Sequence, residues 1–289
     1  MFIFYIVVKR LARLLFSKKS NSMRKQFLLT VGILCPLTIF AAPKKEHYDS
    51  LDGKGGEALF NEVSQVTNKN HRSLGYDGLW AAFDKTDTYP QGHPLEGKIW
   101  DMYGECDSFR KGQCGNYSKE CDCYNREHSI PKSWFGGHTS GIGCDIFHLV
   151  PTDGKVNGMR SNYAFGEVGS KTTYTYNGNK LGSSNFSGYS GTVFEPIDEY
   201  KGDFARGYFG TIIKWMEKNM TSGDGKVMFS GNYTSSGGYG LTAYSIALLM
   251  KWHREDPVSQ KEIDRNDGIE ATQGNRNPFI DIPVLAEYI

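Results

Sequence analysis

Residues 124–162 constrain the fold of this 289-residue chain more than any other stretch. Residues 124–131 read as a strand that ends at Pro131, because proline cannot continue a hydrogen-bonded ladder. Residues 146–150 are bulky and largely apolar and read as a second strand. Pro151 to Asp153 then open a helix, for which Thr152 is a suitable N-cap. This order predicts a ββα finger, which can hold one divalent ion between its first strand and its helix.

Three side chains in this finger have the chemistry of metal-assisted phosphodiester hydrolysis. Glu127 offers a hard oxygen ligand for Mg²⁺, and the adjacent His128 can accept a proton from water near neutral pH. Asn157 offers a second oxygen ligand one turn into the helix, where it can face back toward Glu127. Simpler interpretations remain open: a Glu-His pair is often ordinary surface chemistry, and Asn157 can be a helix-surface residue or a cap. Asn162 is a rival ligand, and His148 can be a buried structural histidine.

The first 41 residues read as a secretory signal peptide with an upstream extension. They contain seven Lys or Arg residues and no Asp or Glu. A charged start at residues 23–26 precedes an apolar run over residues 27–40, which is too short for a membrane span of about 20 residues. We expect cleavage between Ala41 and Ala42, export to the periplasm or the medium, and no stable membrane association afterwards. An uncleaved anchor is the alternative.

Removal of this segment reverses the sign of the net charge. The whole chain carries +1, and the loss of seven positive charges leaves residues 42–289 at −6. A net acidic protein cannot hold a polyanion by its overall field, so binding of nucleic acid would need a local basic surface and a metal ion. Residues 126–160 contain four Lys or Arg and three His against three acidic residues, which gives modest support.

Five cysteines remain after processing, and in an exported chain they are expected to form disulfides. They cluster before and after the Glu127-His128 pair, so bridges are expected to brace the site. The number is odd, and the connectivity cannot be read from the sequence. Zinc is the alternative, because Cys121 and Cys123 lie near His128, but a Cys-x-Cys pair without a second pair fits structural zinc poorly. The five residues are Cys106, Cys114, Cys121, Cys123 and Cys144.

Residues 42–289 have the length of a single domain. Apolar residues at helical spacing predict helices over residues 55–68, 76–83, 204–220 and 242–253, and a further helix is expected over residues 259–273. The last of these begins with Ser259 and has Glu262 three residues later, the pattern of a capping box. The other expected elements are a strand over residues 98–103, a loop or hairpin over residues 172–191, and a loop over residues 274–282. Together, these expected elements predict an α+β, mostly helical mixed fold that contains the ββα finger.

Six short runs follow one another along the chain: Asn125-Arg-Glu-His-Ser-Ile-Pro-Lys-Ser-Trp134, His148-Leu-Val-Pro-Thr-Asp, Val156-Asn-Gly-Met-Arg-Ser-Asn162, Phe194-Glu-Pro, Tyr200-Lys-Gly-Asp-Phe-Ala-Arg206 and Gln273-Gly-Asn-Arg-Asn-Pro-Phe-Ile-Asp281. Together they resemble the bacterial endonuclease I family, a branch of the ββα-metal (His-Me finger) nucleases. The resemblance covers nearly all of residues 42–289. Any one run would be weak, but their joint occurrence in this order is highly specific.

The resemblance implies roles for the matching residues. It places the general base at His128, and it places the protein ligands of one Mg²⁺, or another divalent cation such as Ca²⁺ or Mn²⁺, at Glu127 and Asn157. Phosphate oxygen and water would complete the coordination. It also implies products with 5′-phosphate and 3′-hydroxyl ends. One departure is visible, because many relatives have a histidine or similar polar residue where this chain has Phe147.

Basic and aromatic side chains near these residues are candidates for holding the substrate. Arg160 and Arg206 can grip the scissile phosphate through bidentate guanidinium contacts, with Arg206 the preferred one, although either can instead pair with a nearby aspartate. Lys132 and Lys155 are expected to contact the nucleic-acid backbone or solvent. Trp134 can stack on a base or belong to the core.

These observations predict an exported, metal-dependent and sequence-nonspecific endonuclease that acts on DNA, with RNA left open as a further substrate. Nothing in the chain resembles a base-reading helix or a paired half-site architecture. We expect a monomer. Two alternatives are an inactive nuclease-like protein that binds nucleic acid and a domain held by disulfides or zinc without catalysis. The first would have lost the base or a ligand, and Glu127, His128 and Asn157 are all present.

Overall fold

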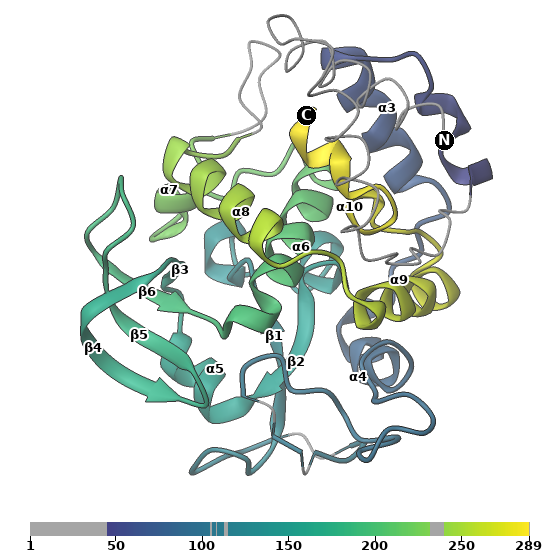
Figure 1. Ribbon diagram of the computed structural model, residues 1–289. Helices are drawn as coiled ribbons and strands as arrows, with labels where there is room; N and C mark the ends of the chain where they lie inside the picture. Colours follow the sequence, from purple (N-terminus) through teal and green to yellow (C-terminus); the bar gives the residue numbers. More distant parts are fainter. Residues whose placement is uncertain (1–44, 105, 108, 113–114, 232–239, 289) are drawn as a thin grey trace, which may run out of the picture. The chain divides into compact units, whose positions relative to one another are not determined.

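The computed structural model describes residues 45–104, 106–107, 109–112, 115–231 and 240–288 (Figure 1). The chain divides into two units, Met1–Ala41 and Ala42–Ile289, and the described residues all belong to the second. The expected signal peptide and its cleavage site lie outside the described residues. None of the helices described is long and apolar enough to cross a membrane.

Five longer helices in the described part of the chain match those expected from the sequence. They are α3 (Gly56–Asn68), α4 (Gly75–Thr86), α6 (Lys201–Lys214), α8 (Ala243–Glu255) and α9 (Gln260–Gln273). The capping box of α9 is confirmed, since Ser259 and Glu262 each accept from the backbone N–H of the other. Helix α6 ends six residues before the predicted end. Trp215 leaves the helical conformation there, and its indole N–H donates to Asp145 Oδ2 (2.6 Å).

Shorter helices connect these elements. Helices α5 (Gly154–Arg160), α7 (Gly225–Met228) and α10 (Pro278–Asp281) have four to seven residues. The loop predicted over residues 274–282 therefore contains a helical turn, because the Asn277 side chain accepts the N–H of Phe279 and caps α10. The 3-10 helices are Lys45–His47, Asp49–Leu51, Lys132–Phe135, Gly141–Cys144, Asp198–Tyr200 and Pro283–Glu287.

Strands β1 (Tyr124–His128) and β2 (Leu149–Asp153) form an antiparallel two-stranded sheet. Strand β1 begins where the predicted first strand begins but ends at His128, three residues before Pro131. Strand β2 begins and ends three residues later than the predicted residues 146–150. The Asp145 carboxylate accepts the N–H of Phe147 (3.1 Å), and its carbonyl accepts the N–H of His148 (3.3 Å). These bonds turn the chain at residues 145–148, so the extended segment begins only at Leu149.

Helix α5 follows β2 directly and contacts both strands of this sheet. Its N-cap is Asp153, whose side chain accepts from the N–H of Val156 (2.9 Å). The prediction of Thr152 as the cap is wrong, because the capping hydrogen bond is made by the side chain of Asp153, the next residue. The chain nevertheless has the predicted order of strand, strand and helix.

A second sheet has the strand order β3–β6–β5–β4. Its strands are β3 (Ala164–Phe165), β4 (Val168–Tyr176), β5 (Asn179–Ser184) and β6 (Thr192–Glu195). Strands β4 and β5 form the hairpin that the sequence predicts as one of two alternatives for residues 172–191. The two-residue turn between them is Asn177-Gly178, both with positive φ (43° and 89°), as a tight hairpin of primed type requires. Helices and antiparallel strands together confirm the α+β class.

Residues 98–103 do not form the predicted strand. Ile99 makes an isolated bridge, and the chain then turns at Asp101. The buried Asp101 carboxylate accepts the N–H groups of Tyr103 (2.9 Å), Cys106 (3.2 Å) and Asp153 (2.8 Å). A carboxylate that gathers three backbone donors holds a turn rather than an extended ladder, and it ties this turn to the start of α5.

The β1–β2 sheet lies between two clusters of buried side chains. Tyr124 and Leu149 belong to a cluster with Phe83 of α4 and Ile269 of α9, two helices that pack on each other (Figure 1). Val150 belongs to a larger cluster around α6, which contacts α3 and α8. The sheet is therefore held from both sides, which fixes the end of β1 that carries Glu127 and His128.

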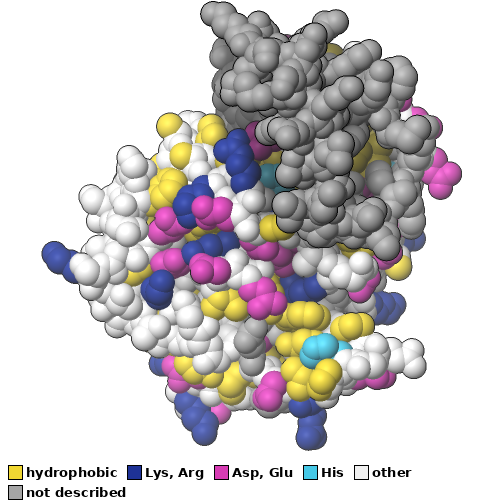
Figure 2. Space-filling model, in the orientation of Figure 1, with side chains coloured by type: hydrophobic (Ala, Val, Ile, Leu, Met, Phe, Trp, Pro, Cys, Tyr) yellow, Lys and Arg dark blue, Asp and Glu magenta, His cyan; other side chains and the backbone are white. Residues whose placement is uncertain are grey.

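On the face that Figure 2 presents, basic and acidic side chains lie next to one another rather than in a patch of one sign. Among the more exposed residues, ion pairs join Lys251 to Glu167 (2.5 Å) and Arg254 to Glu287 (2.7 Å). Neighbouring charges of opposite sign cancel each other's field at a distance. A polyanion therefore needs a more local site.

Candidate active site

Five residues of the predicted site line a cleft of about 420 Å³: Glu127, His128, Lys132, Asn157 and Arg160. Strand β1 contributes Glu127 and His128, and α5 contributes Asn157 and Arg160. The cleft is lined by Tyr76, Arg126, Glu127, His128, Pro131, Lys132, Ser133, Gly137, Asn157, Arg160, Ser161 and Asn162. Asn162, the rival of Asn157 as a ligand, thus also reaches the cleft.

Glu127 is almost completely buried at the base of the cleft, with 2% of its surface exposed. Its Oε1 accepts hydrogen bonds from the Tyr103 hydroxyl (2.8 Å) and from Arg160 Nη1. Burial raises the pKa of the carboxyl, and Arg160 opposes that shift. Within the described residues, both hydrogen bonds of the Glu127 carboxylate go to Oε1, so Oε2 is left for another ligand.

His128 is buried beside Glu127, and its Nε2 lies 3.1 Å from the carbonyl oxygen of Gly143, to which it can donate. Burial and the neighbouring His148 lower its pKa well below the usual value, against the opposing effect of the Gly143 carbonyl. The imidazole is therefore neutral near pH 7, the form that can accept a proton. His148 itself is buried, and burial lowers its pKa to about 4 while its Nε2 contacts the carbonyl of Ile142 (2.8 Å). These features fit the structural role considered for His148.

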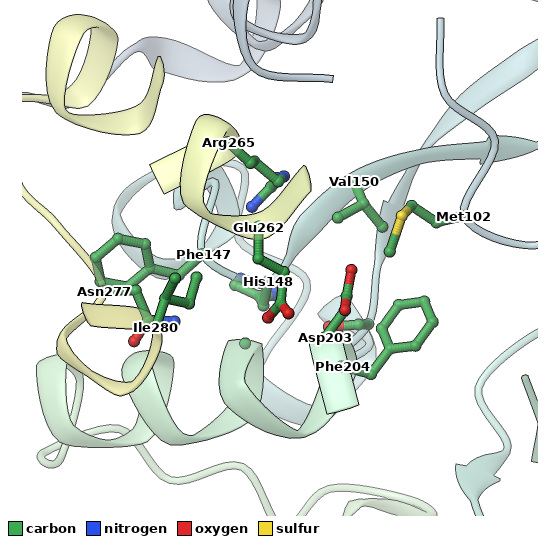
Figure 3. Close-up of a pocket in the computed structure, with 12 residues that line it drawn as sticks. Met102, Phe147, His148, Val150, Asp203, Phe204, Glu262, Arg265, Asn277 and Ile280 are labelled. Atoms are coloured by element: carbon green, nitrogen blue, oxygen red, sulfur yellow. The ribbon is translucent and has the colours of Figure 1, made fainter. Parts of the chain in front are cut away.

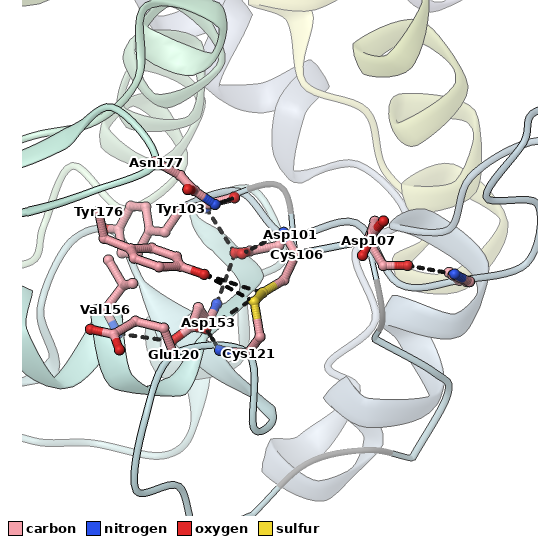
Figure 4. Close-up of a disulfide and its surroundings, with 12 residues drawn as sticks. Asp101, Tyr103, Cys106, Asp107, Glu120, Cys121, Asp153, Val156, Tyr176 and Asn177 are labelled. Carbon is pink, nitrogen blue, oxygen red and sulfur yellow. Dashed lines mark hydrogen bonds between the residues drawn. A yellow bond between two sulfur atoms is a disulfide. The ribbon is translucent and has the colours of Figure 1, made fainter.

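Asn157 is half-buried on α5, and its side chain makes no hydrogen bond within the described residues. The helix is fixed at its start by Asp153, whose Oδ2 accepts from the N–H of Cys121. A disulfide joins Cys121 to Cys106, and the N–H of Cys106 binds Asp101 (Figure 4). The disulfide thus braces the helix that carries Asn157.

The expected disulfide bracing is confirmed for Cys106–Cys121. Cys106, Cys121 and Asp153 have ligand atoms close enough together to hold a metal ion, but both sulfurs are used in the bridge. The zinc alternative loses Cys121 for the same reason. Cys144 is a buried thiol outside this disulfide, and Cys114 lies outside the described residues.

The guanidinium of Arg160 is directed at Glu127 and at backbone carbonyls of the site, and not at solvent. It is 1% exposed and donates to Glu127, to the carbonyls of His128 (2.9 Å) and Ser129 (2.7 Å), and through Nε to the carbonyl of Tyr163 (3.2 Å). The carboxylate that it pairs with is therefore Glu127, not one of the aspartates considered from the sequence.

Two residues predicted to bind substrate lie away from the cleft. Arg206 is fully buried, donates to both oxygens of Glu262, and also donates to the carbonyl of Asp256 (2.8 Å), so its predicted phosphate contact is replaced by the scaffold role. Trp134 is fully buried and packs edge-on against Phe229 at 6.1 Å, so it cannot stack on a base. The places of Arg206 and Trp134 in the sequence motifs did not reveal where either side chain points.

The two candidate lysines differ in position. Lys132 lines the cleft, and its Nζ donates to the Tyr76 hydroxyl (3.1 Å). Lys155 is half-buried on α5 and is not among the described residues that line the cleft. No sequence pattern pointed to Tyr76 or Tyr103, which lie well upstream of the motif. The one signal for Arg126 as a lining residue was its place next to Glu127.

A second, much smaller cavity of about 20 Å³ lies between α6 and α9 (Figure 3). Asp203, Glu262 and His148 point toward it, and its volume suits about one water molecule rather than a nucleotide. Phe147 lines this cavity and not the cleft, with Lys214 Nζ 4.9 Å above its ring. Phe147, the position at which this chain departs from the family pattern, therefore lies outside the cleft.

Comparison with known proteins agrees with this arrangement. The profile of the family Endonuclease I matches residues 56–284. The chain is 33% identical over 251 residues to an extracellular ribonuclease of Bacillus amyloliquefaciens, covering 86% of this chain and 79% of that protein. It is 30% identical over 271 residues to an extracellular ribonuclease of Bacillus subtilis (strain 168), covering 89% and 84%. A periplasmic deoxyribonuclease of Aeromonas hydrophila is 28% identical over 139 residues, 47% of each chain. The chain is thus a nuclease and belongs to the endonuclease I family.

Proposed function

We propose that this protein is an exported, metal-dependent and sequence-nonspecific endonuclease that hydrolyses DNA phosphodiester bonds to 5′-phosphate and 3′-hydroxyl ends. The observation that carries the proposal is that Glu127, His128 and Asn157 line one cleft although they come from a strand and a helix. The cleft volume of about 420 Å³ is large enough for a nucleotide. Acting on one phosphodiester at a time, the protein would work as a monomer.

The donor set fits one divalent cation. Glu127 Oε2 and the side-chain oxygen of Asn157 are hard ligands that border the same cleft, and neither is used in a hydrogen bond within the part of the chain described. Such oxygens suit Mg²⁺, or Ca²⁺ or Mn²⁺, with water and phosphate oxygen in the remaining positions. When bound, the ion would neutralise negative charge on the phosphate and on the leaving oxygen.

His128 would act as the general base of the reaction. Its lowered pKa keeps the imidazole neutral, so it can take a proton from the attacking water, a contribution of about 10²–10⁴ in rate. Arg160 would act on Glu127, because its donors are directed to that carboxylate and to the carbonyls at the end of β1. Lys132 and Lys155 would contact the nucleic-acid backbone, Lys132 from inside the cleft.

RNA is the second candidate substrate. The two relatives that align with most of the chain are named ribonucleases, whereas the relative named a deoxyribonuclease aligns with 47% of it. These relatives are also named extracellular and periplasmic, which supports export of this chain.

The test uses protein purified after export, so that the disulfide can form, incubated with supercoiled plasmid or with RNA in the presence of Mg²⁺. We expect nicking by the parent, loss of nicking with a chelator, and a rate at least about 10²-fold lower for His128→Ala. A parent that binds nucleic acid without cutting it would support the inactive-scaffold alternative instead. Cleavage confined to one short sequence would contradict the lack of sequence specificity.

A further inference from the structure

Tyr76, at the start of α4, joins the cleft from outside the predicted site. Its ring stacks on that of His128, with ring centroids 6.0 Å apart and planes inclined by 26°. The guanidinium carbon of Arg126 lies 3.7 Å from the centre of the Tyr76 ring. Lys132 Nζ lies 5.0 Å from the same centre and donates to the Tyr76 hydroxyl (3.1 Å). One aromatic side chain thus contacts the proposed base and two cations.

Arg126 is held in place before any ligand arrives. Its guanidinium lies on the rings of Tyr76 and Trp80, the second at 4.4 Å, and its Nη1 donates to the Tyr76 carbonyl (2.6 Å). Asp77 Oδ1 is 3.6 Å from the same nitrogen, but its side chain is fully exposed and contributes little. Within the described residues, the bond to the Tyr76 carbonyl is the one hydrogen bond that the Arg126 guanidinium makes. Its Nε and Nη2 therefore remain available as donors. A stacked, oriented guanidinium loses little freedom when it binds a phosphate.

Among the described residues, three Lys and Arg side chains line the cleft, and they differ in how many of their N–H donors are already used. Arg160 has its donors on Glu127 and on backbone carbonyls. Lys132 uses one of its three ammonium protons, on Tyr76. Arg126 and Lys132 are therefore the cleft cations available to a substrate, in a mature chain with a net charge of −6.

We propose that Arg126 and Lys132, positioned by Tyr76, bind a nucleic-acid phosphate adjacent to the one that is hydrolysed. The proposal rests on the proposed nuclease function and adds a phosphate subsite to it. The ligand class is a phosphodiester anion, since a fork of N–H donors beside an ammonium group suits its oxygens. Tyr76 is a positioning residue, because its ring already contacts Arg126, Lys132 and His128 and is not a free platform for a base.

A contact to a non-reacting phosphate is equally strong before and during the reaction. Its loss weakens substrate binding without slowing the chemical step, so KM rises while kcat stays constant. A contact to the scissile phosphate would behave differently, because its charge changes in the transition state and its loss lowers kcat. The kinetic pattern therefore separates the subsite from the reaction centre.

The first experiment measures binding of a fluorescent DNA duplex by anisotropy, with a chelator present so that no cleavage occurs. For Arg126→Ala and for Lys132→Ala we expect about tenfold weaker binding and a salt-dependence slope reduced by about 0.9, the value for one phosphate contact. Arg126→Lys should keep the slope and lose part of the affinity. Arg254→Ala is the matched control. It removes an exposed arginine of α8 that is paired with Glu287, and it should leave slope and affinity unchanged.

The second experiment measures steady-state cleavage with Mg²⁺ for the variants that retain the parent's melting temperature. We expect KM to rise about tenfold for Arg126→Ala and for Tyr76→Ala with kcat within about twofold. Tyr76→Phe keeps the ring under Arg126 and should restore most of the affinity. If Arg126→Ala and Lys132→Ala bind with the parent's affinity and slope, or if kcat falls at constant KM, the subsite proposal is overturned while the nuclease proposal stands. A parent that binds but never cleaves overturns the nuclease proposal, and the salt slopes still test the phosphate contact.

Discussion

Two buried arginine–glutamate pairs, Arg160–Glu127 at the cleft and Arg206–Glu262 between α6 and α9, differ in how many carboxylate oxygens the protein uses. All four side chains are 0–2% exposed. Arg206 binds both oxygens of Glu262, Oε1 through Nε and Oε2 through Nη2 (2.7 Å). At the cleft, Arg160 and Tyr103 both donate to Glu127 Oε1.

The comparison separates a pair that uses both carboxylate oxygens from a pair that uses one. Burial raises the pKa of both carboxyls, and the partner arginine opposes the shift in both. Residue type, burial and pKa direction are thus the same in the two pairs. The distribution of hydrogen bonds differs: Glu262 has partners on both oxygens, whereas Glu127 is fixed through one oxygen and can offer the other to a ligand.

The largest expected effect is on the Arg206–Glu262 pair. Glu262→Ala leaves Arg206 buried without its main partner and should lower the free energy of unfolding by about 3–5 kcal/mol, measured by urea denaturation. Glu287→Ala removes the carboxylate of the exposed Arg254–Glu287 pair and should cost less than about 1 kcal/mol. If the two variants lose equal stability, burial of the Arg206 pair does not have the importance assigned to it here.

Next in size is the loss of the disulfide that braces the cleft. The combined substitutions Cys106→Ser and Cys121→Ser open a bridge with a sequence separation of 15 and should cost about 3 kcal/mol. Because Cys121 also holds the Asp153 cap of α5, the Mg²⁺ concentration for half-maximal cleavage should rise as well. Cys144→Ser is the matched control, which removes a buried thiol but no bridge and should cost about 1 kcal/mol. Unchanged stability and metal response of the double variant would show that the bridge is dispensable.

A smaller effect is expected at Tyr103, which shares Glu127 Oε1 with Arg160. Tyr103→Phe removes one hydrogen bond and should weaken Mg²⁺ binding about tenfold, measured by calorimetry without substrate. Tyr244→Phe removes a buried hydroxyl that donates to the carbonyl of Phe165 (2.9 Å) and should leave Mg²⁺ affinity close to that of the parent. Equal affinities of all three proteins would mean that Arg160 alone fixes the carboxylate.

The smallest expected effect is the response of the cleft to pH. A base is active when deprotonated, so activity rises with pH through its pKa and then levels off. Because the pKa of His128 is well below its usual value, kcat at saturating Mg²⁺ should change by less than about twofold between pH 7.5 and 6.0. A histidine with the usual pKa near 6.5 would lose about fourfold over this interval. A fourfold loss would therefore show that the base is more exposed than the structure indicates.

Local patterns predicted the elements that depend on local interactions. The apolar stripes of α3, α4 and α8 and the capping box at Ser259 that starts α9 are visible in the sequence and present in the structure. The predicted strand over residues 98–103 is wrong because Asp101 binds the N–H of Asp153, 52 positions away. No local pattern reports a partner at that distance.

The same limit applies to the candidate site. Glu127, His128 and Asn157 were predicted as a set from one short stretch, and all three line the cleft. Arg206 was assigned to it from its setting in a motif, but its side chain is directed to α9, where it donates to both oxygens of Glu262. Tyr103 comes from a turn held by distant residues, so its contact with Glu127 becomes visible only when the chain is folded.

Arg160 also has a consequence for how the active form develops during folding. It belongs to α5, yet it donates to Glu127 and to the carbonyls of His128 and Ser129 at the end of β1. A chain with its helices and strands formed but α5 undocked would have Glu127 without this support. Recovery of cleavage during refolding would therefore follow the docking of α5, and catalysis would report the completion of tertiary packing rather than the appearance of secondary structure.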